Sequence, residues 1–484
     1  MFMRSLAPIQ CAMSTGNSGT VVQRLGSRIA DVVERWMPSP FLFAIILSYI
    51  VFLGGVLIEG AGPAAMVGYW YDGFWTLLTF AMQMVLILAT GYVLAYHPFV
   101  RRAIERVASV PNSGKQAVVL VGVIAMVVSW VQWGLGLIVG AVLAREMGRQ
   151  AERRGLAVHY PLLCVAGYMG LGLTWHWGLA GSAPLLMNTP GNVFIEKGIV
   201  DGLISTSQTI FSTYSLTLTV LGIAYAAIAL YLLSPSPEEA EGITEFVPRS
   251  QLDGAAADGG QEQSVESATE TDDERTVGDR INNSRAIGAV IALSGVGVAL
   301  WTFYQEGLGA LNLNVVNFAF LFIGLALFTR PQAYEDEFGE AVMATSGIIL
   351  QFPFYAGIIG MMNASGLSTT LAEALVSVST PETFPAIAWI TAGFINFFVP
   401  SGGGEWTVVG QTVLQAANEL GVPPGQAIVA YAVGDAHTNL FQPFWALPLL
   451  GITGIRARDM FGYAATMLLL LIPFLAVALI VIPY

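Results

Sequence analysis

Long apolar stretches separated by short polar connections are the main pattern of this chain. An α-helix needs about 20 apolar residues to cross the hydrocarbon core of a bilayer. No strand-like alternation persists through these stretches, which disfavours a β-barrel. The pattern therefore predicts an all-α polytopic membrane protein. The candidate segments are 41–59, 73–95, 117–144, 160–180, 205–233, 286–304, 314–329, 341–363, 384–413, 426–450 and 460–483.

Two polar segments lie outside this apolar body. Residues 23–38 have the pattern of an amphipathic helix at the membrane interface, so we expect residues 1–40 to form a cytoplasmic amphipathic N-terminus without a removable signal peptide. Residues 234–285 are acidic and poor in large apolar side chains. Such a segment buries too little surface to offset its ordering entropy, so we expect a disordered cytoplasmic loop. A solvated linker is the favoured interpretation and a regulatory segment is the alternative.

Composition narrows the class of protein. Charged residues make up 11% of the chain, against about 25% in soluble domains. The net charge of −13 comes mostly from the acidic loop, and no basic surface suited to nucleic acid is indicated. Two cysteines exclude a disulfide framework and a cysteine metal cluster.

The positions of the basic residues predict the topology. Arginines before residue 36 place the N-terminus in the cytoplasm. Basic residues flank 117–144 on both sides, at 101–115 and 145–154, and a single span cannot begin and end on one side of the membrane. We therefore expect a re-entrant hairpin, broken within SWVQWGLG (129–136). The stretch 384–413, interrupted by PSGGGE (400–405), is expected to form a second hairpin, entered from outside.

The same scheme contains an inverted repeat. We expect repeat 1 at 41–233, a linking transmembrane helix at 286–313 and repeat 2 at 314–484. Each repeat is expected to contain, in order, two spans, a re-entrant hairpin, a broken span and a final span. GSAPLLMNTPG (181–191) and GDAHTNLFQP (434–443) are expected to interrupt the broken spans. Inverted repeats with discontinuous helices are typical of secondary transporters, which bind substrate near the membrane midplane.

Several motifs carry a family resemblance over nearly the whole membrane body. They are WYDGFWTLLTFAMQMVLILATGYVLA (70–95), WGLGLIVGAVLARE (133–146), TWHWGLAGSAPL (174–185), LQFPFYAGI (350–358), NFFVPSGGGEW (396–406) and GDAHTNLFQPFWALP (434–448). At these motifs the sequence resembles the short-chain fatty acid transporter family, which is similar to the wider ion-transporter superfamily of two-hairpin carriers. The resemblance implies transport of short-chain carboxylates such as acetoacetate or butyrate. Two positions depart from the family pattern: Glu405 stands where a polar amide or His is expected after SGGG, and His437 stands where an aromatic residue is expected before Thr438.

No Lys or Arg lies within the predicted spans, so a bound carboxylate must be held by neutral donors such as hydroxyls, amides and helix N-termini. Glycines at a hairpin tip allow the backbone to approach a ligand, although they also permit close helix packing. The substrate-binding candidates are Gln132, Trp133, Gly134, His176, Gly181, Ser182, Asn188, Thr189, Ser401, Gly402, Gly403, Gly404, Glu405, His437, Thr438 and Asn439.

Ionisable residues inside spans are costly and suggest function. The ion-coupling candidates are Asp435, Asn188 and Asn439, with Asp435 binding Na⁺ or carrying a proton. His176, expected opposite His437 in the repeat, is a donor or proton relay, or else a packing residue. Glu405 lies in the site or faces the outside entrance in contact with water. Gln83 and Gln351 are expected to hydrogen-bond neighbouring helices. No resident cofactor and no firm metal site are expected.

The leading hypothesis is a multi-pass secondary active transporter of short-chain monocarboxylates in the cell membrane, coupled to H⁺ or Na⁺. A di- or tricarboxylate symporter, or one for another organic anion, is the alternative. An integral-membrane enzyme is less favoured because the sequence has no HExxH or GxSxG motif. The expected partners are the carboxylate and the lipid bilayer, with no nucleic acid and with homodimerisation left open.

Overall fold

Helices build all the regular structure of the residues that can be described. The computed structural model describes residues 40–249, 252, 276–397 and 399–484. No β-strand occurs among these residues, which confirms the all-α prediction. Within the described residues, six helices are long and apolar enough to cross a membrane. They are Leu78–Tyr96, Gly114–Val131, Thr213–Leu233, Arg285–Ala310, Ser346–Ser365 and Ala457–Val481.

The first repeat begins at the N-terminal end of the described chain. Its helices are α2 (Pro40–Leu57), α3 (Pro63–Gly73), α4 (Leu78–Tyr96), α5 (Pro98–Ala108), α6 (Gly114–Val131), α7 (Trp133–Arg154), α8 (Tyr160–Met169), α9 (Ser182–Met187), α10 (Val193–Glu196) and α11 (Thr213–Leu233). The last predicted span, 205–233, therefore becomes helical only at Thr213, since residues 205–212 form turns.

The second repeat follows a linking segment of α13 (Val277–Asn282) and α14 (Arg285–Glu306). Its helices are α15 (Leu313–Phe328), α16 (Pro331–Met343), α17 (Ser346–Ser365), α18 (Leu367–Ser377), α19 (Phe384–Asn396), α20 (Gly402–Leu420), α21 (Pro424–Thr438), α22 (Pro443–Thr453) and α23 (Ala457–Val481). The two repeats exchange contacts reciprocally, because α3 packs on α17 and α16 packs on α4.

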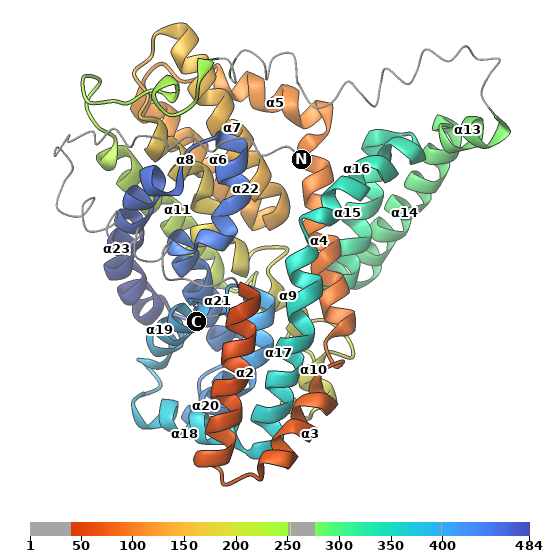
Figure 1. The fold of residues 1–484 in the computed structure, drawn as a ribbon, viewed down its shortest axis with the longest axis vertical. Helices are drawn as coiled ribbons and strands as arrows, with labels where there is room; N and C mark the ends of the chain where they lie inside the picture. Colours follow the sequence, from red (N-terminus) through yellow and green to blue (C-terminus); the bar gives the residue numbers. More distant parts are fainter. Residues whose placement is uncertain (1–39, 250–251, 253–275, 398) are drawn as a thin grey trace, which may run out of the picture.

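The α6–α7 and α19–α20 pairs are the two predicted hairpins, and they enter the molecule from opposite ends (Figure 1). Gly114, which begins α6, lies against the carbonyl oxygen of Ala157, just beyond α7, so both outer ends of the first hairpin meet. In Figure 1, α6 and α7 occupy the upper half, together with α5, while α18 and α20 lie below. We call the upper end, where α5 and the end of α7 carry Arg101–Arg106 and Arg145–Arg154, the arginine-rich end.

The two hairpin tips use the same local structure. Gln132 has extended backbone angles (φ −156°, ψ 114°), and its side chain accepts a hydrogen bond from the Leu135 N–H at the start of α7. Ser401 is also extended (φ −158°, ψ 99°), and its Oγ accepts from the Gly404 N–H at 3.3 Å at the start of α20. Each side chain caps the returning arm, which satisfies a backbone donor that the break leaves free.

In the first repeat, the α-helix of the broken span ends before the segment predicted to interrupt it. After α8 the chain forms a π-helical turn (η1, Gly170–Thr174), then a 3₁₀ turn (η2, Trp175–Trp177), before α9. The predicted segment 181–191 is thus partly helical, and the break lies ahead of it. Gly178 and Gly181 sit against the carbonyls of Trp130 and His176, where no Cβ would fit, so these glycines allow the chain to turn. In the second repeat, η7 (Asn439–Phe441) and the extended Gln442 separate α21 from α22, within the predicted 434–443.

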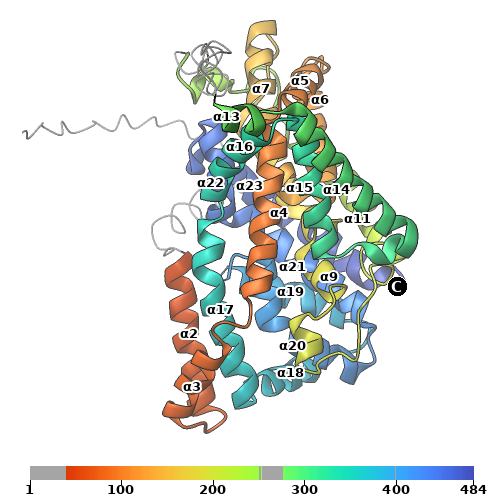
Figure 2. The same ribbon diagram turned by 90° about the vertical axis from the view of Figure 1, so that its right-hand side faces the viewer.

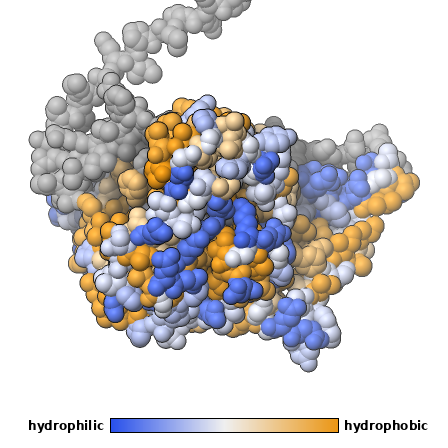
Figure 3. All heavy atoms as spheres, turned by 90° about the horizontal axis from the view of Figure 1, so that it is seen from below, coloured by the Kyte–Doolittle hydropathy of each residue, from blue (hydrophilic) through white to orange (hydrophobic). Residues whose placement is uncertain are grey.

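The periphery of the body is suited to lipid. α14 lies at the outer side of the molecule beside α15 and α16 (Figure 2), and it exposes large apolar side chains such as Val290, Leu293 and Leu300. Seen from below, hydrophilic residues gather near the middle of the lower end and hydrophobic residues surround them (Figure 3). This distribution fits a body embedded in a bilayer and open to water at its end.

The acidic loop is not disordered along its whole predicted length. In its first part, residues 234–249, Ile243 and Val247 are buried. The Tyr160 N–H donates to the Glu241 carbonyl oxygen at 2.8 Å, and the Glu241 N–H donates to His159 Nδ1 at 3.2 Å. The apolar side chains of this short segment are buried at the arginine-rich end. This burial offsets the entropy cost of ordering the segment. Residues 250–251 and 253–275, like the predicted amphipathic helix before residue 40, lie outside the described residues.

Candidate functional site

A chain of buried polar groups crosses from the first repeat to the second at the centre of the molecule. Ser182 Oγ lies 2.8 Å from His176 Nε2, and His176 Nδ1 lies 2.5 Å from Asp435 Oδ2. The carboxyl groups of Asp435 and Glu405 are within hydrogen-bonding reach of each other, and the Tyr431 hydroxyl donates to Glu405 Oε1 at 2.6 Å. His176, Asp435 and Glu405 are fully buried. We call these five residues the central cluster.

Three discontinuous elements position the central cluster. Asp435 and Tyr431 lie one turn apart on the last turns of α21, just before its break. Glu405 is in the first turn of α20, directly after the second hairpin tip, where the helix dipole favours a carboxylate. His176 comes from η2 in the break of the first repeat. The prediction that Glu405 faces an outside entrance is therefore wrong, because the tip buries it against α21.

The carboxylates of the central cluster lack the cations that usually accompany buried acids. Among the described residues, the ion pair of Asp435 is with His176 alone, and no Lys or Arg pairs with Glu405. Glu405 Oε2 and Asp435 Oδ1 receive no hydrogen bond from a donor in the described part of the chain. Buried polar groups without partners are rare and costly, so they indicate a site rather than a packing arrangement.

The hydrogen bonds of His176 select one tautomer of its ring. The Ala183 N–H donates to His176 Nε2 at 3.3 Å, and a backbone N–H can only be a donor. Nε2 is therefore the accepting nitrogen, which assigns the ring proton to Nδ1, the nitrogen near Asp435 Oδ2. Trp175 stacks on the imidazole at 4.3 Å with an interplanar angle of 6°, which fixes the ring plane.

Both hairpin tips end on one aromatic layer beside the central cluster. Trp133 begins α7, and its ring lies 5.6 Å from that of Trp175 and 5.6 Å from that of Trp445. Gly402 begins α20 and lies directly against the Trp175 ring; a Cβ there would be 2.8 Å from His176 Cε1. The positive N-terminal ends of two helices thus converge on this layer from opposite sides.

The aromatic layer also holds free donors. The indole N–H groups of Trp133 and Trp175 are buried and make no hydrogen bond within the described chain. An indole nitrogen is a donor only, so it can bind an anion without a cation nearby. The layer therefore combines an apolar wall, helix N-termini and unpartnered N–H donors, a composition suited to a small carboxylate with an acyl tail.

A second polar hub links the two broken spans. Asn396 Nδ2 lies 2.9 Å from the Asp435 carbonyl oxygen, 2.9 Å from Thr438 Oγ1 and 2.8 Å from Asn439 Oδ1. Asn439 Nδ2 donates to the Leu171 carbonyl oxygen at 3.2 Å, in the π-helical turn of the first repeat. Thr438 and Asn439 thus lie beside the central cluster as predicted site residues.

Sequence reasoning missed three residues of this region. Asn396, Tyr431 and Gln442 are buried, and Gln442 Nε2 donates to the Asn396 carbonyl oxygen at 2.9 Å. A signal was available for two of them, since Asn396 and Gln442 stand in the family motifs next to PSGGG and PFWALP. Tyr431 had no such signal, because only the fold brings it to Glu405.

Three predicted site residues lie away from the central cluster. Asn188 Nδ2 donates to the carbonyl oxygens of Gly309 and Leu311, both at 3.0 Å, so this amide fastens the linker that precedes α15. Thr189 Oγ1 accepts from the Leu313 N–H at 3.2 Å in the same place. His437 does not face His176; its Nε2 lies 2.9 Å from the Leu468 carbonyl oxygen on α23.

The remaining predicted residues shape the tips. Gln132 Nε2 donates to the Ile87 carbonyl oxygen at 2.5 Å, and Gly134 lies against the backbone of α4. Gly403 and Gly404 lie against Phe80 and Tyr355, so their missing side chains let the second tip approach the core. Gln83 Nε2 donates to Asn314 Oδ1 at 2.7 Å, which confirms that it joins neighbouring helices.

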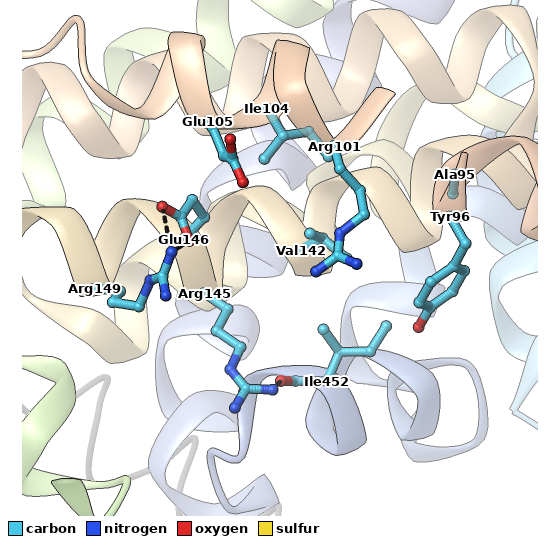
Figure 4. A pocket seen from close by; sticks show the side chains of 10 residues that line it. All are labelled: Ala95, Tyr96, Arg101, Ile104, Glu105, Val142, Arg145, Glu146, Arg149 and Ile452. Atoms are coloured by element: carbon cyan, nitrogen blue, oxygen red, sulfur yellow. Dashed lines mark hydrogen bonds and ion pairs between the residues drawn. The ribbon is translucent and has the colours of Figure 1, made fainter. Parts of the chain in front are cut away.

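A cavity of about 280 Å³ lies at the arginine-rich end, between α5, α7 and the end of α22 (Figure 4). Arg101 and Arg145 extend into it from α5 and α7; Arg145 Nη1 donates to the Ile452 carbonyl oxygen at 3.0 Å. Arg149 is paired with Glu146 at 2.8 Å. No residue of the central cluster lines this cavity, so the cavity is separate from that cluster.

Comparison with known proteins agrees with these features. The model of the family described as "Short chain fatty acid transporter" matches residues 21–482. The chain belongs to the short-chain fatty acid transporter family. A relative from Escherichia coli (strain K12), named for short-chain fatty acid transport, is 36% identical over 449 residues, which cover 93% of this chain and 97% of the relative. One from Haemophilus influenzae (strain ATCC 51907 / DSM 11121 / KW20 / Rd), named likewise, is 33% identical over 465 residues, or 95% and 99% of the two chains.

Two solved structures share the fold of this family member. The Alcanivorax borkumensis YdaH transporter, described as having an unusual topology, superposes with a TM-score of 0.55 at 15% identity, covering 91% of this chain and 98% of that one. Neisseria gonorrhoeae MtrF, described within a class of antimetabolite efflux pumps, gives 0.54 at 15% identity, covering 93% and 97%. These two structures show a shared fold, while membership of the short-chain fatty acid transporter family makes the chain a multi-pass membrane transporter rather than an enzyme.

Proposed function

We propose that this protein is a secondary active transporter of short-chain monocarboxylates, coupled to a cation, H⁺ or Na⁺. The observation that carries the proposal is the pairing of a donor-lined aromatic layer with two buried carboxylates that no Lys or Arg of the described chain accompanies, both beside the hairpin tips. The layer supplies an anion site and the acids supply a cation site. The names of the relatives support a short-chain fatty acid as the anion.

The carboxylate of the substrate would bind at the Trp133–Trp175 layer, between the first residues of α7 and α20. Its charge would be stabilised by the helix N-termini and the indole N–H groups, and its acyl chain would lie against the aromatic rings. One donor cluster and an apolar wall favour a monocarboxylate, because a second carboxylate would require a second set of donors.

The coupling cation would bind at Asp435 and Glu405, which are adjacent to the anion layer through His176 and Gly402. Glu405 and the substrate-facing backbone belong to the same tip of α20, so movement of this tip would change both sites together. Such coupling fits alternating access by movement of one repeat against the other around a central site. We further propose that the arginine-rich end is cytoplasmic, as the positive-inside rule favours, with the N-terminus on that side.

The test is transport by the purified full chain in liposomes preloaded with unlabelled butyrate. Labelled butyrate should exchange into them faster than into protein-free liposomes, which measure passive diffusion of the protonated acid. Unlabelled acetate, butyrate and acetoacetate should compete, and succinate should not. Competition by succinate alone would instead support a dicarboxylate carrier, and no exchange with any of these anions would refute the proposal.

A further inference from the structure

We infer that the coupling ion is the proton, that it is shared between the carboxyl groups of Glu405 and Asp435, and that neutral His176 closes this proton site from the first repeat. This inference rests on the proposed transport function and selects one of its two coupling ions. It also gives Glu405 a coupling role, where the sequence alone made it a substrate-binding candidate.

The charges in the central cluster require that one of its two acids holds a proton. Two carboxyl groups within hydrogen-bonding reach cannot both ionise in a buried site unless a cation stands beside them, so one of them holds a proton. No Lys or Arg of the described chain pairs with either acid. His176 does not supply the charge, because its Nε2 accepts the Ala183 N–H and the ring is therefore neutral.

The atoms that surround the two acids distinguish a proton from Na⁺. Sodium requires oxygen acceptors, whereas the groups aimed at this pair are donors. The Tyr431 hydroxyl donates to Glu405, and the nitrogen nearest Asp435 Oδ2 is His176 Nδ1. The Asp435 carbonyl oxygen, an obvious ligand for Na⁺ at an unwound helix, already accepts from Asn396 Nδ2 at 2.9 Å. This surrounding fits a shared proton better than a metal cation.

The other titratable groups on the helices around this pair make their hydrogen bonds elsewhere. Tyr355 on α17 lies near Glu405, but its hydroxyl donates to Gln351 Oε1 at 3.1 Å. His437, on the same helix as Asp435, turns towards α23. The proton-binding groups that remain are Glu405, Asp435 and His176, with Tyr431 as a fixed donor.

Release of the proton would require the elements that hold Glu405 and His176 to move. Glu405 follows Ser401 by four residues on α20, so movement of the second tip relative to α21 would separate Glu405 from Asp435 and end the sharing. His176 is held by Ser182 and Ala183 at the start of α9, so separation of α9 from the imidazole would free Nε2 to accept a proton. The site would bind one proton from one side and release it to the other. One proton carried with one carboxylate anion makes the cycle electroneutral.

The experiment compares net uptake with exchange, using labelled acetoacetate and the full chain in liposomes with choline in place of Na⁺. Net uptake is measured at one external pH while the internal pH is raised; passive influx, set by the external acid, is subtracted with protein-free liposomes. Exchange is measured at equal pH on both sides. For the unsubstituted protein, we expect net uptake to rise with internal pH and to need no Na⁺.

Two variants test the residues and one serves as the control. In E405Q and D435N, net uptake should fall by about 100-fold, the low end for loss of a positioned proton-transfer group, while exchange falls far less. E419Q, an exposed acid-to-amide change on the same helix α20, should behave as the unsubstituted protein. Retained exchange also shows that the variants are folded.

Each contrary result has a distinct meaning. A requirement for Na⁺, or pH-driven net uptake that survives both substitutions, would overturn proton coupling while leaving carboxylate transport intact. Equal loss of net uptake and exchange in both variants would contradict a proton-carrying role and assign these acids to structure. Absence of both activities in the unsubstituted protein would instead remove the proposed function itself.

Discussion

Asn396 offers the sharpest test of how the two broken spans are held together. Its side-chain amide has two N–H donors and three acceptors within 2.9 Å: the Asp435 carbonyl oxygen, Thr438 Oγ1 and Asn439 Oδ1. Two hydrogen bonds can therefore be complete at any time. A buried hydrogen bond contributes about 1 kcal/mol, so Asn396→Ala should lower the free energy of unfolding by about 2 kcal/mol.

This loss can be measured by equilibrium unfolding in mixed dodecyl maltoside and SDS micelles, followed by circular dichroism. Asn418→Ala is the matched control, because Asn418 is exposed on α20 and an exposed substitution should change the free energy of unfolding by less than about 0.5 kcal/mol. The same two proteins should differ in butyrate exchange, since Asn396 also positions the turn that carries Asp435. If Asn396→Ala were no more destabilising than Asn418→Ala, the hub would not hold the breaks together.

Three further changes test separate parts of the structure. Gly402→Ala places a Cβ against Trp175 and should abolish most butyrate exchange. Gly297→Ala, in open space on α14, is the control and should leave exchange unchanged. Equal exchange by both variants would argue against close packing of the second tip on Trp175. Trp133→Phe keeps an aromatic side chain, although a smaller one, and removes an unpartnered N–H, so the half-saturating butyrate concentration should rise about fivefold, for a loss of about 1 kcal/mol; an unchanged value would exclude this donor. Burial lowers the pKa of His159 from 6.5 to about 4, so the folded protein keeps it neutral and loses stability as pH falls from about 6.5 to about 4. This difference corresponds to about 3 kcal/mol, and His159→Gln should flatten the pH dependence of unfolding; an unaltered pH profile would show that His159 does not cause it.

The hairpins could be predicted from sequence because they follow from charge and length. Basic residues on both sides of 117–144 exclude a single crossing, and the structure folds this stretch into α6 and α7. The second tip was visible as PSGGGE, since Pro400 disfavours continuation of the preceding helix and Ser401 caps the helix that begins at the three glycines. The helix breaks were less exact, because a π-helical turn at Gly170–Thr174 has no clear sequence signal.

Residues of the candidate site could be predicted from the sequence only where they lie near a helix break. His176, Asp435 and Gly402 all do, and the structure brings them together. Asn188 resembled a second ion ligand because it repeats the spacing of Asn439, yet the linker before α15 occupies its amide. Spacing along one repeat carries no information about a linker that approaches from outside the repeat.

Tyr431 and Glu405 show the same limit for partners across helices. One turn of α21 separates Tyr431 from Asp435, but its contact with Glu405 depends on how α20 and α21 pack after the hairpin. A fully buried acid also cannot be distinguished from a water-exposed acid by sequence when it directly follows a glycine-rich tip. Its burial is a property of the packed tips, which only the fold reveals.

The most direct test of proton-coupled carboxylate transport is net uptake of labelled butyrate into Na⁺-free liposomes that are alkaline inside and carry the unsubstituted protein. We expect a saturable initial rate above that of protein-free liposomes, increasing with the proton gradient and unchanged by added Na⁺. A rate equal to that of protein-free liposomes, or one that appears only when Na⁺ is added, would contradict it.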